Sequence, residues 1–147
     1  MSALVIGVGN PFRGDDAFGP RVADGLVARG FAATAHDGDG LGLIHLWEGH
    51  SPVHLVDAAR FDGQPGRLLR FDVGKAGLPA ELSGTTSHLV GVAEAVGVAR
   101  ALDRLPDRLV VHAISARAFG LGEAMTPAVE GMVEVLVQAL AGELATG

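Results

Sequence analysis

Cysteine is absent from the 147 residues of this chain, which excludes disulfide bonds, thiolate zinc sites and a cysteine nucleophile. The motif G-x-S-x-G is also absent, which argues against a serine hydrolase. Basic residues form no cluster and the formal net charge is −6, which argues against a nucleic-acid partner. No apolar run approaches the roughly 20 residues of a membrane span, and no basic n-region precedes the first apolar run. We therefore expect a cytoplasmic protein with no membrane or nucleic-acid partner.

Hydrophobic residues make up 48% of the chain and charged residues 19%, which excludes disorder as the main state. Strand and helix patterns alternate. Strands are predicted at Leu4–Val8, Ala32–His36, Val53–Val56, Arg67–Phe71 and Leu109–Ile114, and helices at Asp16–Arg29, Leu41–Trp47, His88–Asp103 and Pro127–Leu144. This alternation favours an α/β fold, a single domain over residues 1–147 with helices on both faces of a mostly parallel sheet.

The ends of these predicted elements carry further signals. Only about ten residues join the third strand to the fourth, which is near the lower limit for a parallel crossover and allows one antiparallel pair. Thr126 is a suitable N-cap for the last helix, and Gly30 stands where the first helix should end.

The most informative segment is the loop after the first strand. The apolar run ends at Val8, a Gly9-Asn10-Pro11 turn follows, and Asp15-Asp16 then opens an amphipathic stretch. The loop is not a dinucleotide fingerprint, because Phe12 stands where the third glycine should be and two aspartates would repel a pyrophosphate. In open α/β sheets ligands bind at this carboxyl edge of the strands, so we expect a loop that binds a cation.

Three polar residues fall at equivalent places along the chain. Asp16 follows the first strand, Asp57 follows the third, and His88 opens the third helix. If the first and third strands are neighbours, Asp16 and Asp57 flank one crevice, and His88 could close it. Two carboxylates and an imidazole suit a borderline divalent cation such as nickel or zinc.

Each of these residues also has an ordinary interpretation. Asp15 or Asp16 could simply cap the first helix, Asp57 could cap the turn after its strand, and His88 could be an unremarked residue at a helix start. The local patterns leave these alternatives open.

The other histidines give weaker signals. His45 and His50 have neither zinc-protease spacing, so we interpret them, together with His54, as structural. His112 lies inside an apolar strand and is predicted to be a satisfied core histidine. His36 ends the second strand and could support the site from behind.

Five segments carry a family resemblance: Leu4 to Gly19 with its G-x-G-N and Asp-Asp elements, Asp37-Gly38 with Gly42-Leu43, Val56-Asp57-Ala58 with Pro65-Gly66, Ser87-His88 with Gly91, and Gly122-Glu123 with Met125-Thr126-Pro127. In this combination the sequence resembles the hydrogenase maturation proteases, endopeptidases that trim the C-terminal tail of the large subunit of nickel–iron hydrogenases. The resemblance runs nearly end to end.

The resemblance implies a three-layer α/β/α sandwich with a mainly parallel, five-stranded twisted sheet. It implies that Asp16, Asp57 and His88 are both the metal contacts and the catalytic residues, and that Asp37 bears on metal selection. The nickel would arrive in the substrate rather than as a resident cofactor, and zinc or cadmium could replace it in crystals. The implied partner is a hydrogenase large-subunit precursor, cut after nickel insertion by a monomeric protease. Metal contact is expected to weaken below about pH 6, where histidine protonates.

Two departures from the family pattern keep alternatives open. Asp39-Gly40 replaces the usual Gly-Thr and is expected to add negative charge beside the cleft, and His112-Ala-Ile-Ser115 replaces Gly-Ile-x-Pro. A non-catalytic nickel-checkpoint or scaffold protein for hydrogenase assembly would use the same cleft. An α/β enzyme acting on small molecules would need an anion site, which the acidic loop disfavours.

Overall fold

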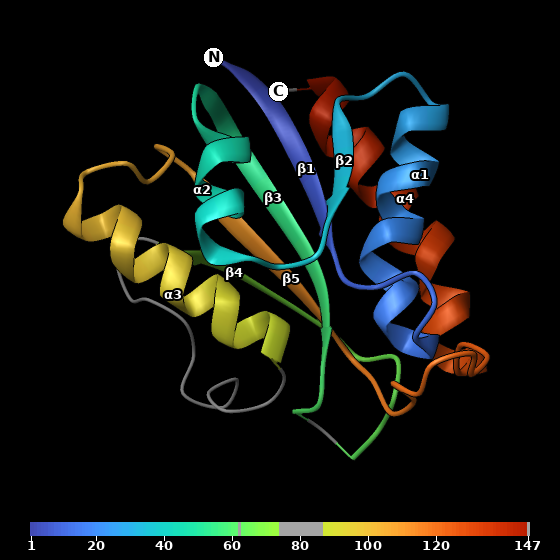
Figure 1. The fold of residues 1–147 in the computed structure, drawn as a ribbon. Helices are drawn as coiled ribbons and strands as arrows, with labels where there is room; N and C mark the ends of the chain where they lie inside the picture. The colour runs from blue at the N-terminus through green and yellow to red at the C-terminus, as the bar shows by residue number, and fades with distance from the viewer. Residues whose placement is uncertain (62, 74–86, 147) are drawn as a thin grey trace.

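The computed structural model describes residues 1–61, 63–73 and 87–146, and for residues 87–90 the backbone alone. The elements follow in the order β1 (Ser2–Val8), η1 (a 3-10 helix, Gly14–Ala17), α1 (Phe18–Ala28), β2 (Ala33–His36), α2 (Gly40–Trp47), β3 (His50–Ala59), β4 (Leu68–Val73), α3 (Ser87–Ala101), β5 (Leu109–Ser115) and α4 (Pro127–Thr146). Every predicted strand and helix is therefore present, with the first predicted helix divided into η1 and α1 (Figure 1).

The strands form one five-stranded sheet in the order β2-β1-β3-β5-β4. β1 pairs in parallel with both β2 and β3, and β3 pairs in parallel with β5. β4 is antiparallel and pairs with β5 at the sheet edge. The short connection after β3 thus leads to an antiparallel strand, but the chain crosses β5 to reach it and β3 and β4 are not neighbours.

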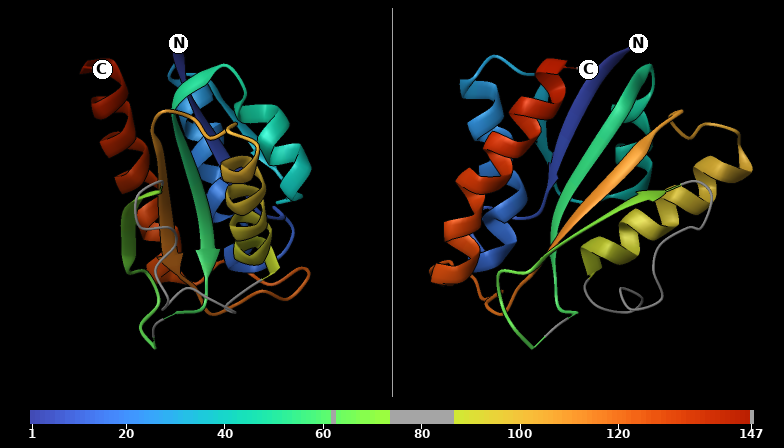
Figure 2. Two further views of the ribbon diagram at one scale, coloured as in Figure 1. Left: turned by 90° about the vertical axis from the view of Figure 1, so that its left-hand side faces the viewer. Right: turned by 180° about the vertical axis from the view of Figure 1, so that it is seen from behind.

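Two helical layers cover the sheet and confirm the predicted α/β/α sandwich. α1 and α4 lie on one face, and α2 and α3 lie on the other (Figures 1 and 2). Alternate residues of each strand point to opposite faces, so each central strand contributes to both cores. Val5, Val56 and Ile114 pack under α1 and α4, whereas Ile6, Leu55 and Val111 pack under α2 and α3. Burial on both faces explains why the central strands are almost continuously apolar in sequence.

Close backbone contacts set the start of α1 directly on the sheet. A Cβ atom on Gly19 would lie 2.5 Å from the carbonyl oxygens of both Val8 and Val56, and one on Gly7 would lie 2.0 Å from the carbonyl oxygen of Gly19. Only glycine allows so close an approach of helix and strands. The consequence is that η1, just before α1, packs against β3 as well as following β1.

Two element ends differ in detail from the sequence prediction. β3 continues past Val56 to Ala59, so Asp57 lies within the strand rather than after it. Gly30 follows the end of α1 with a φ of 85°, as predicted for a residue that stops a helix. Across the described ranges, no helix combines the length and the hydropathy needed to cross a bilayer.

Candidate functional site

The predicted site residues lie at the carboxyl edge of the parallel strands. The loop from β1 to η1, the end of β3 and the loop from β5 to α4 all lie at this edge (Figure 1). The first turn of α3 lies at the same end of the sheet in both views of Figure 2. The expectation that β1 and β3 are neighbours is confirmed, with Gly7 opposite Val56.

Asp16 occupies η1 and is 1% exposed. Its Oδ2 accepts a hydrogen bond of 3.0 Å from the backbone N–H of Asn10, so the Gly9-Asn10 turn folds back onto the carboxylate. Gly9 has a φ of 145°, and a Cβ atom there would lie 2.0 Å from the carbonyl oxygen of Asp16. The glycine is therefore required for the turn that encloses Asp16.

Asp57 lies in β3, in register with Ala113 of β5, and is fully buried. Its Oδ1 accepts a hydrogen bond of 2.8 Å from the backbone N–H of Ala58. By strand alternation its side chain lies on the α2 and α3 face of the sheet. Because η1 packs against β3, the structure brings both predicted carboxylates to one edge of the sheet.

His88 is the second residue of α3, as the sequence indicated, but its side chain lies outside the described part of the structure. The backbone of the next turn is well placed: a Cβ atom on Gly91 would lie 2.3 Å from the carbonyl oxygen of Gly38. The start of α3 thus lies against the loop between β2 and α2. Among the described side chains, no three or more His, Cys, Asp or Glu residues are grouped closely enough to hold a metal ion.

Asp15, which the sequence reasoning treated only as a possible helix cap, anchors two loops. Its Oδ2 accepts hydrogen bonds from the backbone N–H groups of Arg117 and Ala118, both at 2.9 Å. Thr126 donates twice, from its backbone N–H to Oδ1 at 2.6 Å and from its hydroxyl to Oδ2 at 2.7 Å. Burial by itself would raise the pKa of the Asp15 carboxyl, but these hydrogen bonds outweigh burial and hold the pKa below its usual value.

These contacts also correct the prediction for Thr126. It does precede the first residue of α4, but its hydroxyl donates to Asp15 and its backbone carbonyl accepts from Val129 and Glu130. No local pattern marked this role, since the partners of Asp15 are more than 100 residues away in sequence. Neither η1 nor α1 is capped by an acidic side chain, so the helix-cap interpretation of Asp15 and Asp16 is wrong.

The acidic residues of the β2–α2 loop have local roles. Asp39 is exposed and caps α2, its Oδ2 accepting a hydrogen bond of 3.1 Å from the backbone N–H of Gly42. The side chain of Asp37 is 83% exposed and lies beside His36. The ring of His36 accepts a hydrogen bond of 3.0 Å from the backbone N–H of Gly38 and so shapes this loop.

His54 and His112 form a buried pair on neighbouring strands, away from the carboxyl edge. Nδ1 of His54 lies 2.9 Å from Nε2 of His112, and the rings are stacked with centroids 5.1 Å apart. The prediction that both are structural is confirmed. Burial, followed by the proximity of His54 and Arg70, lowers the pKa of His112 to about 3, and burial also lowers the pKa of His54. Both rings are therefore neutral at physiological pH.

Comparisons with known proteins agree on the family. The family model described as hydrogenase maturation protease matches residues 38–143, a segment that contains Asp57 and His88 but begins after Asp16. A search of curated proteins found no significant match.

Solved structures of maturation proteases share the fold. The [NiFe] hydrogenase maturation protease HybD from Thermococcus kodakarensis is similar over 98% of this chain and 99% of its own, with a TM-score of 0.82 and 21% identity. The hydrogenase 2 maturation peptidase from Thaumarchaeota archaeon SCGC_AB-539-E09 is similar over 98% of both chains, with a TM-score of 0.70 and 29% identity. The hydrogenase maturating endopeptidase HybD from E. coli covers 99% of this chain and 93% of its own, with a TM-score of 0.75 and 22% identity.

Proposed function

The chain belongs to the hydrogenase maturation protease family, and we propose that it removes the C-terminal extension of a nickel–iron hydrogenase large-subunit precursor after nickel insertion. Asp16, Asp57 and His88 would recognise the nickel that the precursor carries. The ion then reports that the precursor is ready for processing, and cleavage follows only when it is present.

One observation carries the proposal: two buried carboxylates from separate elements, Asp16 and Asp57, lie at one edge of the sheet. A buried carboxylate is screened less by water than an exposed one, so it attracts a divalent cation more strongly. Each carboxylate has one oxygen held by a backbone N–H, which orients the group before the substrate arrives. The α3 start, with His88 in its first turn, lies at the same edge.

The chemistry follows from the charge of the ion. Nickel held between the protease and the precursor would polarise the scissile carbonyl or lower the pKa of a water molecule towards about 7. Either route forms the attacking species without a serine or cysteine nucleophile. One of the carboxylates would accept the proton that the water releases.

The direct test mixes the protein with nickel-loaded, unprocessed large subunit and follows loss of the tail by mass spectrometry. Asp57→Asn and His88→Ala should each lower the cleavage rate about 100-fold or more, since each removes a metal contact. Asp24→Asn, an exposed residue on α1, is the matched control and should cleave at the wild-type rate. Circular dichroism melting curves check that every variant folds. Wild-type rates in both site variants would contradict the proposal.

The non-catalytic checkpoint alternative loses its motives in this structure. Asp39 caps α2 in an exposed position, and His112 lies in the sheet core rather than at the carboxyl edge. The same experiment still separates the two functions, because a checkpoint protein would bind the nickel-loaded precursor and leave its tail intact.

A further inference from the structure

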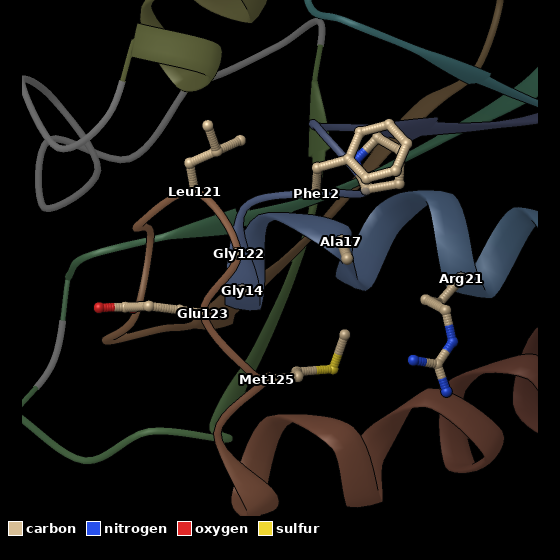
Figure 3. A pocket seen from close by; sticks show the side chains of 9 residues that line it. Phe12, Gly14, Ala17, Arg21, Leu121, Gly122, Glu123 and Met125 are labelled. Atoms are coloured by element: carbon tan, nitrogen blue, oxygen red, sulfur yellow. The ribbon is translucent and has the colours of Figure 1, made fainter.

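A pocket of about 540 Å³ lies beside the proposed metal site, between the β1–η1 loop and the β5–α4 loop (Figure 3). We call it the loop pocket. The side chains that matter most in its lining are Phe12, Ala17, Arg21, Leu121, Glu123 and Met125. Gly14 and Ala17 also line it and are the neighbours in sequence of Asp15 and Asp16. The loop pocket therefore adjoins the proposed site through the same short helix, η1.

The walls of the loop pocket are unusually apolar for a surface. Phe12 is 72% exposed and Leu121 is 71% exposed, and they come from segments more than 100 residues apart in sequence. Figure 3 shows both side chains at the same side of the pocket, with Met125 below them. Large apolar side chains that converge on one exposed hollow are typical of a binding surface, because an apolar ligand group would remove them from water.

The loops that carry these side chains are fixed to each other. The backbone N–H of Gly122 donates to the carbonyl oxygen of Phe12 at 2.8 Å. Asp15 holds the β5–α4 loop at Ala118 and at Thr126, and a Cβ atom on Gly14 would lie 2.6 Å from the carbonyl oxygen of Ala118. A ligand would therefore meet a preformed pocket and would not have to order it, which saves conformational entropy on binding.

The charges at the pocket favour a ligand with a carboxylate beside its apolar group. The guanidinium of Arg21 extends from α1 towards Met125, whereas the carboxylate of Glu123 points away from Phe12 and Arg21 (Figure 3). Glu123 is also engaged within its own loop, where it accepts a hydrogen bond from Gly120. Arg21 lies 4.0 Å from Glu130 and both side chains are about half exposed, so this ion pair is weak enough for a ligand carboxylate to replace.

We propose that the loop pocket binds an apolar side chain of the precursor's C-terminal segment, with Arg21 pairing to an acidic group of the same segment. This assignment rests on the proposed function, which requires a peptide to lie beside Asp16. The occupant is a peptide because the pocket adjoins the proposed cleavage site, and its apolar walls and single inward cation select the residues of that peptide.

Methionine methyl groups offer a direct test of occupancy. The chain has three methionines, Met1, Met125 and Met132, of which only Met125 lines the loop pocket. In protein labelled with ¹³C at the methionine methyl groups, a synthetic 20-residue peptide that spans the cleaved bond of the precursor should shift the Met125 signal. The Met1 and Met132 signals should stay in place. A Met125 signal that the peptide leaves unmoved would overturn the assignment.

Cleavage kinetics with the nickel-loaded precursor provide the second test. Phe12→Ser and Leu121→Ser should each raise KM by about 5- to 20-fold and change kcat less than about twofold, since one buried apolar contact is lost in each. Arg21→Glu should raise KM in the same way and make it less sensitive to salt. Val135→Ser, an exposed apolar residue on α4 outside the pocket, is the matched control and should leave KM unchanged.

These outcomes distinguish the pocket from the proposed function. Cleavage with an unchanged KM in Phe12→Ser and Leu121→Ser would overturn the pocket assignment and leave the protease activity standing. A Met125 shift by the peptide, without any cleavage of the precursor, would support the pocket as a peptide site and remove the proposed function.

Discussion

At the scale of single residues, the two adjacent aspartates of η1 have different surroundings and different roles. Asp15 accepts hydrogen bonds from Arg117, Ala118 and Thr126, and its carboxylate joins the start of the chain to the loop before α4. Asp16 accepts from Asn10 within its own loop. One aspartate therefore holds the site together, and the other is left for the proposed metal contact.

Replacing Asp15 should destabilise the protein strongly. In Asp15→Asn an amide N–H₂ takes the place of one oxygen and meets backbone N–H donors, so we expect the free energy of unfolding to fall by about 2–4 kcal/mol. Urea denaturation measures this loss. Asp24→Asn, an exposed substitution of the same chemistry, should change it by less than about 0.5 kcal/mol. A loss below about 1 kcal/mol in Asp15→Asn would contradict the anchoring role.

At the scale of elements, the α2 cap explains a residue that departs from the family pattern. Asp39 has extended backbone geometry at the N-cap of α2, and its carboxylate accepts from Gly42 in the first turn. A negative charge at this end of a helix also interacts favourably with the helix dipole. The departure therefore contributes to the stability of α2, and no role in metal chemistry is needed to explain it.

Asp39→Ala tests this interpretation. Loss of the cap should lower the free energy of unfolding by about 1 kcal/mol. The cleavage rate with nickel-loaded precursor should stay within about twofold of wild type, because the side chain is exposed and faces its own helix. Asp39→Asn, which keeps a capping oxygen, is the control and should recover most of the stability. A large loss of activity with unchanged stability would assign Asp39 to the site instead.

At the scale of the whole molecule, the buried pair His54 and His112 makes stability depend on pH. Burial is the largest cause of both lowered pKa values. Arg70 and Arg108 near His54 lower its pKa further, whereas Glu143 and Asp72 oppose the shift. Among the described residues, Nε2 of His54 has no hydrogen-bond partner, so a proton added there would be buried without an acceptor.

The direction of the pH effect follows from these pKa values. An unfolded histidine gains a proton near pH 6.5, whereas folded His112 stays neutral down to about pH 3. The unfolded state therefore binds more protons between these limits, and the protein loses stability as the pH falls from about 6.5. The slope for His112 approaches about 1.4 kcal/mol per pH unit between pH 6 and 4.

Urea denaturation of wild type and of the double variant His54→Leu/His112→Leu, at intervals between pH 7 and 4, measures this effect. The double variant removes both partners of the pair, so its stability at pH 7 should change little and its decline with acid should be clearly shallower. His45→Gln, an exposed histidine on α2, should keep the wild-type slope. Equal slopes in wild type and in the double variant would exclude the pair as the cause.

Much of the fold could be predicted because its signals are local. The apolar runs of the strands and the stripe of the last helix reflect the burial of those same residues, so their periods marked β1 to β5 and α4 correctly. Gly30 marked the end of α1 for the same reason, since a positive φ is a property of the residue itself. The placement of Asp16 and Asp57 at one edge could also be predicted, because parallel strands end on the same side of a sheet.

Other features depend on partners that are distant in sequence. β4 carries no mark that it pairs with β5 and not with β3, because both neighbours would present the same backbone groups. Asp15 and Thr126 read as two separate helix signals until folding brought them within hydrogen-bond distance. Phe12 and Leu121 have no common pattern in the chain, yet they form one pocket.

By itself, then, the sequence determined the order and type of the elements and the acidic edge of the sheet, since periodicity, turns and strand direction are encoded within a few residues. Only the tertiary structure decided which of two adjacent aspartates anchors the loops, which strand pairs with β4, and where an apolar pocket opens beside the site. Those outcomes depend on backbone groups and side chains that become neighbours when the helices pack on the sheet, and spacing along the chain does not record them.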